Sequence, residues 1–278
     1  MALRVGRIPF LVCAPFFHDF LGRESEFGDV EFVDGAPSAH CAGLKNGSIH
    51  LSPASSITFA QKPGAFVLAP DICTSCSFEV RSVKLFSKVP IEELSHKTVC
   101  LTAQSMTSIN LLKILLQERF GLEPVYKSGT YEATDDACLL IGDQALEENE
   151  RHRFAFGYDL GALWQDWQQV PFVFGAWIVA KSALKPDLEQ SLFRYLQATR
   201  DSVEKFRENP TKALDKWLAH YPVDLPRAVV ENYYSAIDYR FTDDRKRSLS
   251  LFFEHAAALG LIETAPNLEF LAFPSQEE

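Results

Sequence analysis

Hydroxyl side chains gather at a turn within residues 99–116, where a strand-like apolar run gives way to a helical one. The hydroxyls are those of Thr102, Ser105, Thr107 and Ser108. The free N–H groups and the dipole at a helix N-terminus favour an anion, whereas helix capping needs only one hydroxyl. The turn therefore indicates a carboxylate-binding site, with capping as the alternative.

A second turn of the same kind lies in residues 51–60, where a short strand ends and Ser55 or Ser56 opens a helix. Capping is again the alternative. Two such turns, one on each side of a cleft, offer two anion sites, which suits a dicarboxylate. A phosphate ligand is less well supported, because the chain has no glycine-rich loop or Walker pattern.

A third segment, residues 138–146, places Asp143 after Gly142 at the end of a buried apolar run. Gly142 permits a tight exit from a strand, so Asp143 is either a helix N-cap or a residue of the site. A fourth, residues 159–179, carries tryptophans and an aromatic strand. Most of these rings are expected in the core, and some can form the floor of a cleft.

Familiar catalytic and metal-binding patterns are missing from the sequence. His18 is the histidine nearest to a predicted cleft segment, and we interpret it as a core or surface residue rather than a site residue. Cys73 and Cys76 have redox or zinc spacing but no second CxxC or HxxxH partner. The six cysteines are therefore expected to be reduced core thiols, and no metal ligands are predicted.

Composition excludes several classes of partner. The chain has 278 residues, 47% of them apolar, and a net charge of −10. The acidic balance argues against nucleic acid and anionic membranes, which select for basic patches. No segment approaches the roughly 20 apolar residues of a membrane span, and the first residues lack the features of a secretory signal. We therefore expect a cytoplasmic protein, whose oligomeric state the sequence does not determine.

The first 180 residues alternate strand-like and helical segments. Strands are predicted at residues 3–8, 30–33, 49–52, 65–68, 80–87, 99–102, 137–141, 154–158 and 172–180. Such alternation is typical of a largely parallel sheet covered by helices on both faces.

After Pro186 the pattern becomes helical. Helices are predicted from residue 188 to 206, 211–220, 226–238 and 243–259, and they are expected to pack on an earlier domain. Chain crossings at residues 87–90 and 170–177 predict an inserted lobe. The expected division is residues 1–87 plus 175–278 in one lobe and 88–174 in the other, with the ligand between them.

Taken together, these segments resemble the chorismate dehydratase family of the futalosine route to menaquinone. The matching stretches are Gly6-Arg7-Ile8 with Pro15, Ser55-Ser56, residues 80–90, Leu101-Thr102 with Ser105 and Thr107-Ser108, residues 140–143, and residues 171–174 with Trp177. A sister family that acts on a cyclic futalosine derivative shares some of these turns, but residues 82–87 and 171–174 are closer to the dehydratases. The resemblance implies an α/β fold like that of type II periplasmic binding proteins, with two lobes, a hinge and C-terminal helices.

The resemblance also implies a reaction. Chorismate would lose water to give 3-[(1-carboxyvinyl)oxy]benzoate, which requires no cofactor because the ring becomes aromatic without an electron acceptor. The base would be either Asp143 or the substrate's own enolpyruvyl carboxylate, oriented by Ser82. Substrate-binding positions would be Val12, Ser55, Ser56, Ser105, Thr107, Ser108, Pro171 and Phe172.

Two positions depart from the family pattern: Val12 stands where members usually have Asn, and Gln168-Gln169 where a Thr-Gly pair is common. The Asn lies in the family's ligand site, so Val12 bears directly on activity. A protein that only binds or senses a small aromatic or carboxylate ligand is the alternative function.

Overall fold

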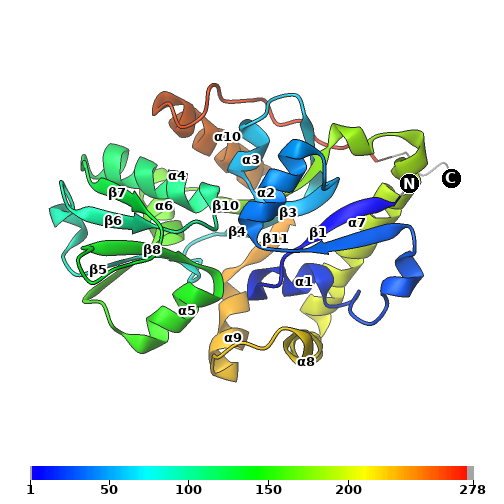
Figure 1. Cartoon of the computed structure of the whole chain (residues 1–278), viewed down its shortest axis with the longest axis horizontal. Helices are drawn as coiled ribbons and strands as arrows, with labels where there is room; N and C mark the ends of the chain where they lie inside the picture. The colour runs from blue at the N-terminus through cyan, green and yellow to red at the C-terminus, as the bar shows by residue number, and fades with distance from the viewer. Residues whose placement is uncertain (1, 274–278) are drawn as a thin grey trace.

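The strand-like segments form two separate sheets in the computed structural model, which describes residues 2–273 (Figure 1). The first sheet has the order β11-β4-β10-β3-β1-β2 and the second β7-β6-β8-β5-β9. The first contains β1 (Leu3–Arg7), β2 (Val30–Asp34), β3 (Leu51–Ser55), β4 (Phe66–Cys76), β10 (Phe172–Ala180) and β11 (Asp238–Phe241). The second contains β5 (Val83–Ser87), β6 (Thr98–Leu101), β7 (Val125–Ser128), β8 (Ala137–Ile141) and β9 (Phe156–Asp159). We call each sheet with its helices a lobe.

Both sheets are mixed, so the prediction of a largely parallel sheet is wrong. In the first sheet β1 runs parallel to β2 and β3, but β10 is antiparallel to both β3 and β4. In the second, β6 is parallel to its neighbours and β5 is antiparallel to β8 and β9. The reason is the chain path: β4 leads out of the first lobe and β10 leads back, so these neighbours run in opposite directions.

The chain crosses between the lobes earlier than the sequence indicated. Residues 83–87 form β5, which pairs with β8 and β9 of the second sheet. The first crossing is therefore residues 77–82, before β5, and the predicted boundary at residue 87 has to move to the other side of this strand. The return crossing lies between β9 and β10, so residues 172–174 belong to the first sheet rather than to the expected inserted lobe of residues 88–174.

Helices cover both sheets. They are α1 (Ala14–Phe17), α2 (Pro37–Asn46), α3 (Ile57–Ala60), α4 (Met106–Ile114), α5 (Gly142–Arg151), α6 (Leu160–Gln168), α7 (Pro186–Glu208), α8 (Pro210–His220), α9 (Arg227–Tyr233) and α10 (Asp243–Ala258). The four predicted C-terminal helices correspond to α7–α10. The strands β7 and β11 were not predicted, because β7 is short and largely exposed and β11 follows directly on the α9 region.

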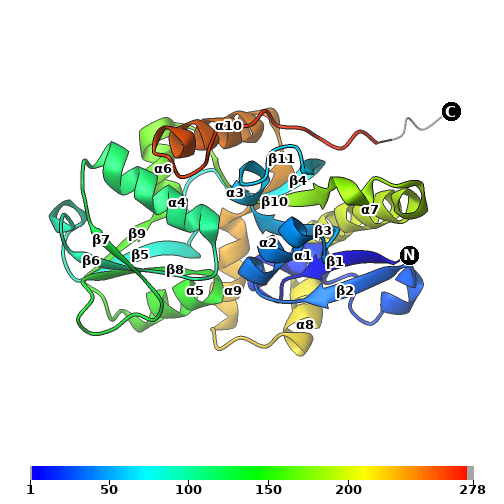
Figure 2. The ribbon, with the colours of Figure 1, turned by 45° about the horizontal axis from the view of Figure 1, so that its top comes forward.

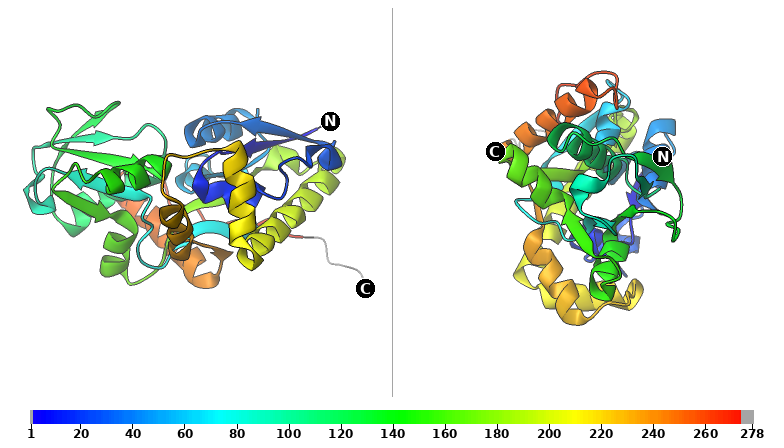
Figure 3. Two further views of the ribbon diagram at one scale, coloured as in Figure 1. Left: turned by 90° about the horizontal axis from the view of Figure 1, so that it is seen from below. Right: turned by 90° about the vertical axis from the view of Figure 1, so that its left-hand side faces the viewer.

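The C-terminal helices connect the lobes rather than forming a separate domain. Helix α7 packs on β1 and α1, and α10 packs on β10 and also on α4 of the second lobe (Figure 2). On the underside, α9 lies between the two lobes (Figure 3). The core is continuous across this arrangement: one cluster of buried apolar side chains extends from β1 to α6 and α10.

Candidate ligand-binding cleft

A small cavity lies where the two lobes face each other. Its volume is about 100 Å³, which is below the roughly 300–1,000 Å³ of typical ligand sites. It is lined by Ile8, Phe10, Val12, Cys13, Pro37, Pro53, Ala54, Ser55, Thr74, Val80, Ser82, Val83, Ser105, Ser108, Ile141, Gly142, Phe174 and Gly175. No charged side chain is among these residues, so the polar groups of the wall are hydroxyls and backbone groups.

Three of the predicted hydroxyls meet at the N-terminus of α4. Ser105 is the N-cap and accepts a hydrogen bond from the backbone N–H of Ser108. The Ser105 Oγ lies 3.0 Å from Ser108 Oγ and 3.3 Å from Ser55 Oγ across the lobes. Two contacts use two of the three hydroxyl protons, so one proton remains for a ligand. Capping and ligand binding are thus compatible here. The oxygen of Ser105 caps the helix as an acceptor, and the remaining hydroxyl proton can be donated to a ligand.

Ser82 and Thr74 supply two further hydroxyls to the cavity wall. Ser82 is 4% exposed, and its Oγ lies 2.9 Å from the hydroxyl of Tyr233 on α9. Thr74 on β4 makes no side-chain hydrogen bond within residues 2–273, and it faces the cavity. The cavity wall therefore presents hydrogen-bond donors to an uncharged interior, which suits ligand oxygens.

Ser56 and Thr107 do not reach the cavity. Both are fully buried where α3 meets α4, in a chain of bonds that we call the hydroxyl seam. Ser56 Oγ donates to the carbonyl of Val173 at 2.9 Å and lies 3.2 Å from Thr107 Oγ1, which accepts from the N–H of Ile57 at 3.1 Å. Because Ser56 already donates to Val173, Thr107 must donate to Ser56. Neither hydroxyl proton is left for a carboxylate.

Asp143 also lies beside the cavity rather than in its wall. It stands in the first turn of α5 and accepts a hydrogen bond from the backbone N–H of Leu11 in the first lobe, at 3.3 Å. Next to it, Gly142 has φ +59, and a Cβ there would lie 3.2 Å from the ring of Phe10. We call these contacts the carboxylate seam. Burial raises the pKa of Asp143 to about 6.

The aromatic strand contributes a different residue from the one predicted. Phe172 is 1% exposed and packs against Trp164 and Phe252 in the core. Pro171 accepts a hydrogen bond through its carbonyl from Ser248. Neither lines the cavity, whereas Phe174 and Gly175 do. A local irregularity in the pairing of β10 with β4 occurs at these residues, and a strand bulge of this kind cannot be located from the sequence.

Val12 lines the cavity from the short 3-10 turn η1 (Leu11–Cys13). Two tyrosines from the C-terminal segment hold this turn by its carbonyl groups. Tyr234 donates to the carbonyl of Leu11 at 2.6 Å, and Tyr239 donates to that of Val12 at 2.9 Å. The apolar side chain of Val12 therefore faces the ligand space from a fixed backbone.

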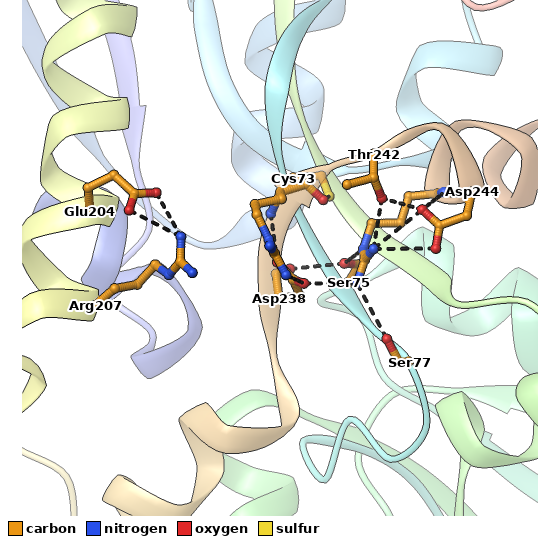
Figure 4. A network of polar contacts seen from close by, with 10 residues as sticks. Cys73, Ser75, Ser77, Glu204, Arg207, Asp238, Thr242 and Asp244 are labelled. Atoms are coloured by element: carbon orange, nitrogen blue, oxygen red, sulfur yellow. Dashed lines mark hydrogen bonds and ion pairs between the residues drawn. The ribbon is translucent and has the colours of Figure 1, made fainter.

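A buried arginine fixes the strand from which the first crossing departs. The Arg245 guanidinium donates from Nε to Ser75 Oγ at 2.7 Å and from a terminal nitrogen to Asp238 at 3.0 Å. Arg245 also lies 3.4 Å from Ser77 Oγ, and Figure 4 shows the side chains of Ser75, Ser77 and Asp238 in this polar network. These contacts join β4, β11 and α10, so the chain enters residues 77–82 from a rigid position.

The remaining candidate residues are structural. His18 is buried and its Nε2 lies 2.9 Å from the carbonyl of Ser202, and burial lowers its pKa. The six cysteines are buried and not disulfide-bonded. Cys13 borders the cavity, but burial raises the pKa of its thiol far above neutrality, which keeps it a poor nucleophile. Within residues 2–273, no cluster of three or more metal-ligating side chains occurs.

The sequence did not reveal Thr74 and Phe174, which line the cavity, or Tyr233, which contacts Ser82 from outside the cavity wall. Thr74 lies between Cys73 and Cys76, and nothing in this spacing indicates a ligand-facing hydroxyl. Alternation along β10 did not identify Phe174, because the register shifts between Val173 and Gly175. No sequence pattern indicated Tyr233, because it is 151 residues away from its partner Ser82.

Comparison with known proteins agrees with this architecture. The family model for menaquinone biosynthesis matches residues 3–258. A chorismate dehydratase of Thermus thermophilus is 30% identical over 237 residues, covering 78% of this chain and 82% of the relative. No helix in the described part of the chain is long and apolar enough to cross a membrane.

Solved structures are similar in fold at low sequence identity. A protein of Archaeoglobus fulgidus superimposes with a TM-score of 0.73 at 17% identity, covering 93% of this chain and 98% of that one. The alkanesulfonate-binding protein of Xanthomonas axonopodis pv. citri, bound to MOPS, gives a TM-score of 0.71 at 13% identity, with 96% of both chains covered. The predicted two-lobed α/β fold of the periplasmic-binding-protein type is thus confirmed, and the chain belongs to the menaquinone-biosynthesis family.

Proposed function

We propose that this protein is a chorismate dehydratase, a carbon–oxygen lyase that acts in menaquinone biosynthesis. One observation carries the proposal: the cavity between the lobes presents hydroxyl donors and the N-terminus of α4 to a space lined by no charged side chain. The family match and the Thermus thermophilus relative support it. We place the activity in the cytoplasm, with a small dicarboxylate as substrate and neither nucleic acid nor a membrane as partner.

The proposed reaction is an elimination that makes a ring aromatic. The ring carbon that bears the ether loses its proton, and the C–H electron pair forms the new ring double bond. The neighbouring carbon loses its hydroxyl group, which leaves as water with a proton. The product is 3-[(1-carboxyvinyl)oxy]benzoate, and no electrons pass to another molecule. We therefore expect no cofactor.

The hydroxyls of the cavity have distinct tasks in this proposal. Ser55, Ser105 and Ser108 hold one carboxylate at the N-terminus of α4, where the helix dipole favours negative charge. Ser82 orients the enolpyruvyl carboxylate towards the ring proton. Preorganised donors of this kind act mainly by positioning the reacting groups and by stabilising developing charge.

The substrate's own carboxylate is the favoured base in this account. Asp143 is bonded to the backbone of Leu11 and does not line the cavity. Replacing Asp143 with Asn keeps an oxygen that accepts this bond but removes the basic group. If Asp143 were the base, turnover by Asp143→Asn would fall by about 10²-fold or more; we expect a change of only a few fold.

Binding without catalysis is the second candidate, and Val12 is the observation that favours it. An apolar wall stands where the resemblance implies an amide. If Val12 has replaced only a positioning group, Val12→Asn should raise turnover of chorismate, because a restored polar group strengthens positioning in the transition state. If the pocket has been rebuilt around an apolar wall, neither form should convert chorismate.

The test is to incubate purified protein and Val12→Asn with chorismate and to measure the product by chromatography and mass spectrometry. We expect product from both forms and a higher rate from Val12→Asn. No product from either form would remove the enzyme assignment. If calorimetry then showed that the protein binds 3-[(1-carboxyvinyl)oxy]benzoate, the alternative of a binding protein would be supported.

A further inference from the structure

The residue that carries Ser82 into the cavity is held in an uncommon backbone conformation. Arg81 has φ +62, a left-handed conformation that side chains other than glycine rarely adopt. The carboxylate of Asp159 accepts from the N–H of Val80 at 3.0 Å and from that of Arg81 at 2.6 Å. Asp159 belongs to the second lobe, so this lobe fixes the backbone just before Ser82.

The hydroxyl of Ser82 has one side-chain partner among the described residues, Tyr233. The two oxygens are 2.9 Å apart, and both side chains are buried. Geometry alone leaves open which of the two is the donor. The direction of this bond decides what Ser82 can offer to a ligand.

The cavity distinguishes the two hydroxyls: Ser82 lines it, so a ligand oxygen can accept the proton of Ser82, whereas Tyr233 does not line it. The ring of Tyr233 is 1% exposed, and its hydroxyl has no other partner in residues 2–273. A buried hydroxyl that donates to nothing is costly, and burial raises the pKa of this phenol, so its proton is retained. Ser82 Oγ is the acceptor within reach. Once it accepts from Tyr233, the proton of Ser82 points away from the tyrosine and towards the cavity that Ser82 lines.

We propose that Tyr233 is a positioning residue that turns Ser82 into a dedicated hydrogen-bond donor for an oxygen of the bound ligand. The inference rests on the proposed function and extends it to a residue outside the cavity wall. Tyr233 acts through Ser82 and touches no reacting atom. Its contribution is orientation, because a hydroxyl that rotates freely spends only part of its time aimed at the ligand.

The first test is the steady-state kinetics of Tyr233→Phe with chorismate. This variant keeps the ring and removes the donor. We expect kcat to fall about 10-fold, the effect of one neutral hydrogen bond, with KM changed by less than about threefold because the lost orientation acts mainly in the transition state. Tyr195→Phe is the control, since Tyr195 is equally buried in the first lobe away from the cavity; it should leave kcat unchanged.

A double-mutant cycle separates positioning from a general structural effect. If Tyr233 acts through Ser82, the Ser82→Ala/Tyr233→Phe variant should have the same kcat as Ser82→Ala alone. The inference would be overturned if the kcat losses of the two single variants multiplied in the double variant. It would also be overturned if Tyr233→Phe had the kcat of the wild type. Thermal unfolding of each variant checks that it is folded.

A second measurement needs no substitution. A crystal structure of the wild-type protein with 3-[(1-carboxyvinyl)oxy]benzoate should show a ligand oxygen within hydrogen-bond distance of Ser82 Oγ, with the Tyr233 contact retained. A ligand that leaves Ser82 without a contact would contradict the inference even if Tyr233→Phe does not fold. Failure of the wild type to convert chorismate would instead count against the proposed function, and the structure with the bound product would still decide the role of Tyr233.

Discussion

Two of the places where the lobes meet around the cavity differ in chemistry. In the hydroxyl seam, α3 and α4 are joined by Ser56 and Thr107, fully buried, with every hydroxyl proton used. In the carboxylate seam, one 3.3 Å bond joins Leu11 to Asp143, and the acceptor is a partly desolvated acid. The first seam is strong and satisfied, while the second carries an energetic cost at neutral pH. The difference predicts that loss of a polar group destabilises the protein at the hydroxyl seam and stabilises it at the carboxylate seam.

The largest effect on stability is expected at the hydroxyl seam. Thr107→Val keeps the shape of the side chain but leaves the buried N–H of Ile57 without an acceptor. We expect the free energy of unfolding to fall by about 2–3 kcal/mol, the cost of an unsatisfied buried group. Urea denaturation of the wild type and the variant measures this difference in unfolding free energy. Thr199→Val is the control: it removes a buried hydroxyl that donates to the carbonyl of Tyr195 one helical turn earlier, and it should cost less than about 1 kcal/mol.

The carboxylate seam should respond in the opposite direction. The pKa of Asp143 is about 6 in the folded protein against 3.8 ordinarily, so the folded state binds the proton more tightly than the unfolded one. The contribution of Asp143 therefore lowers the free energy of unfolding as pH rises from about 4 to 6. Above that range the contribution stays constant. Asp143→Asn should stabilise the protein by on the order of 2 kcal/mol at pH 8, with the gain vanishing near pH 4.

Denaturation of both forms at pH 4, 6 and 8 tests this expectation. A stability difference that does not change with pH would mean that Asp143 is not buried as described. A wild type that is more stable than the variant at pH 8 would mean that its bond to Leu11 outweighs desolvation, and the two seams would then be alike.

A smaller effect on stability is expected at the contact of Phe10 with Gly142, and two glycine variants separate it from backbone strain. Gly142→Ala and Gly260→Ala both place alanine at a positive φ, of +59 and +66, but a Cβ meets Phe10 only at residue 142. Each should lose about 1 kcal/mol for the backbone conformation. An additional loss at residue 142, of about 0.5–1 kcal/mol, should report the packing of the seam. If urea denaturation gives the same loss of unfolding free energy for both variants, the ring of Phe10 moves aside without an energetic cost.

Local patterns predicted much of the scaffold, because they depend on neighbouring residues. The strand-to-helix turn at Ser105 was recognisable from its hydroxyls and the following apolar face. Which hydroxyl faces the cavity was not, since Thr107 and Ser108 are adjacent and only the docking of α4 on α3 decides between them. The same limit applies to the strand order, which depends on where β4 and β10 cross between the lobes.

Long-range partners set the other limit. Tyr233 and Ser82 are far apart in sequence, and so are Asp143 and Leu11. No periodicity or spacing joins such pairs, because the contact exists only after both lobes and the C-terminal helices have assembled. Asp143 illustrates the consequence: its place at a strand end was predicted, but its bond to the backbone of the other lobe was not.

The most direct test of the account is the value of kcat/KM for chorismate in the wild type, Ser108→Ala and Ser95→Ala. Ser108→Ala removes a hydroxyl of the cavity and keeps the backbone N–H that donates to Ser105. Ser95 belongs to the same lobe but accepts only an exposed backbone bond. We predict conversion by the wild type, a loss of about 10- to 100-fold for Ser108→Ala, as for a hydrogen bond to a charged group, and none for Ser95→Ala. Equal rates for all three would contradict the assignment of the cleft, and a wild type without turnover would contradict the enzyme.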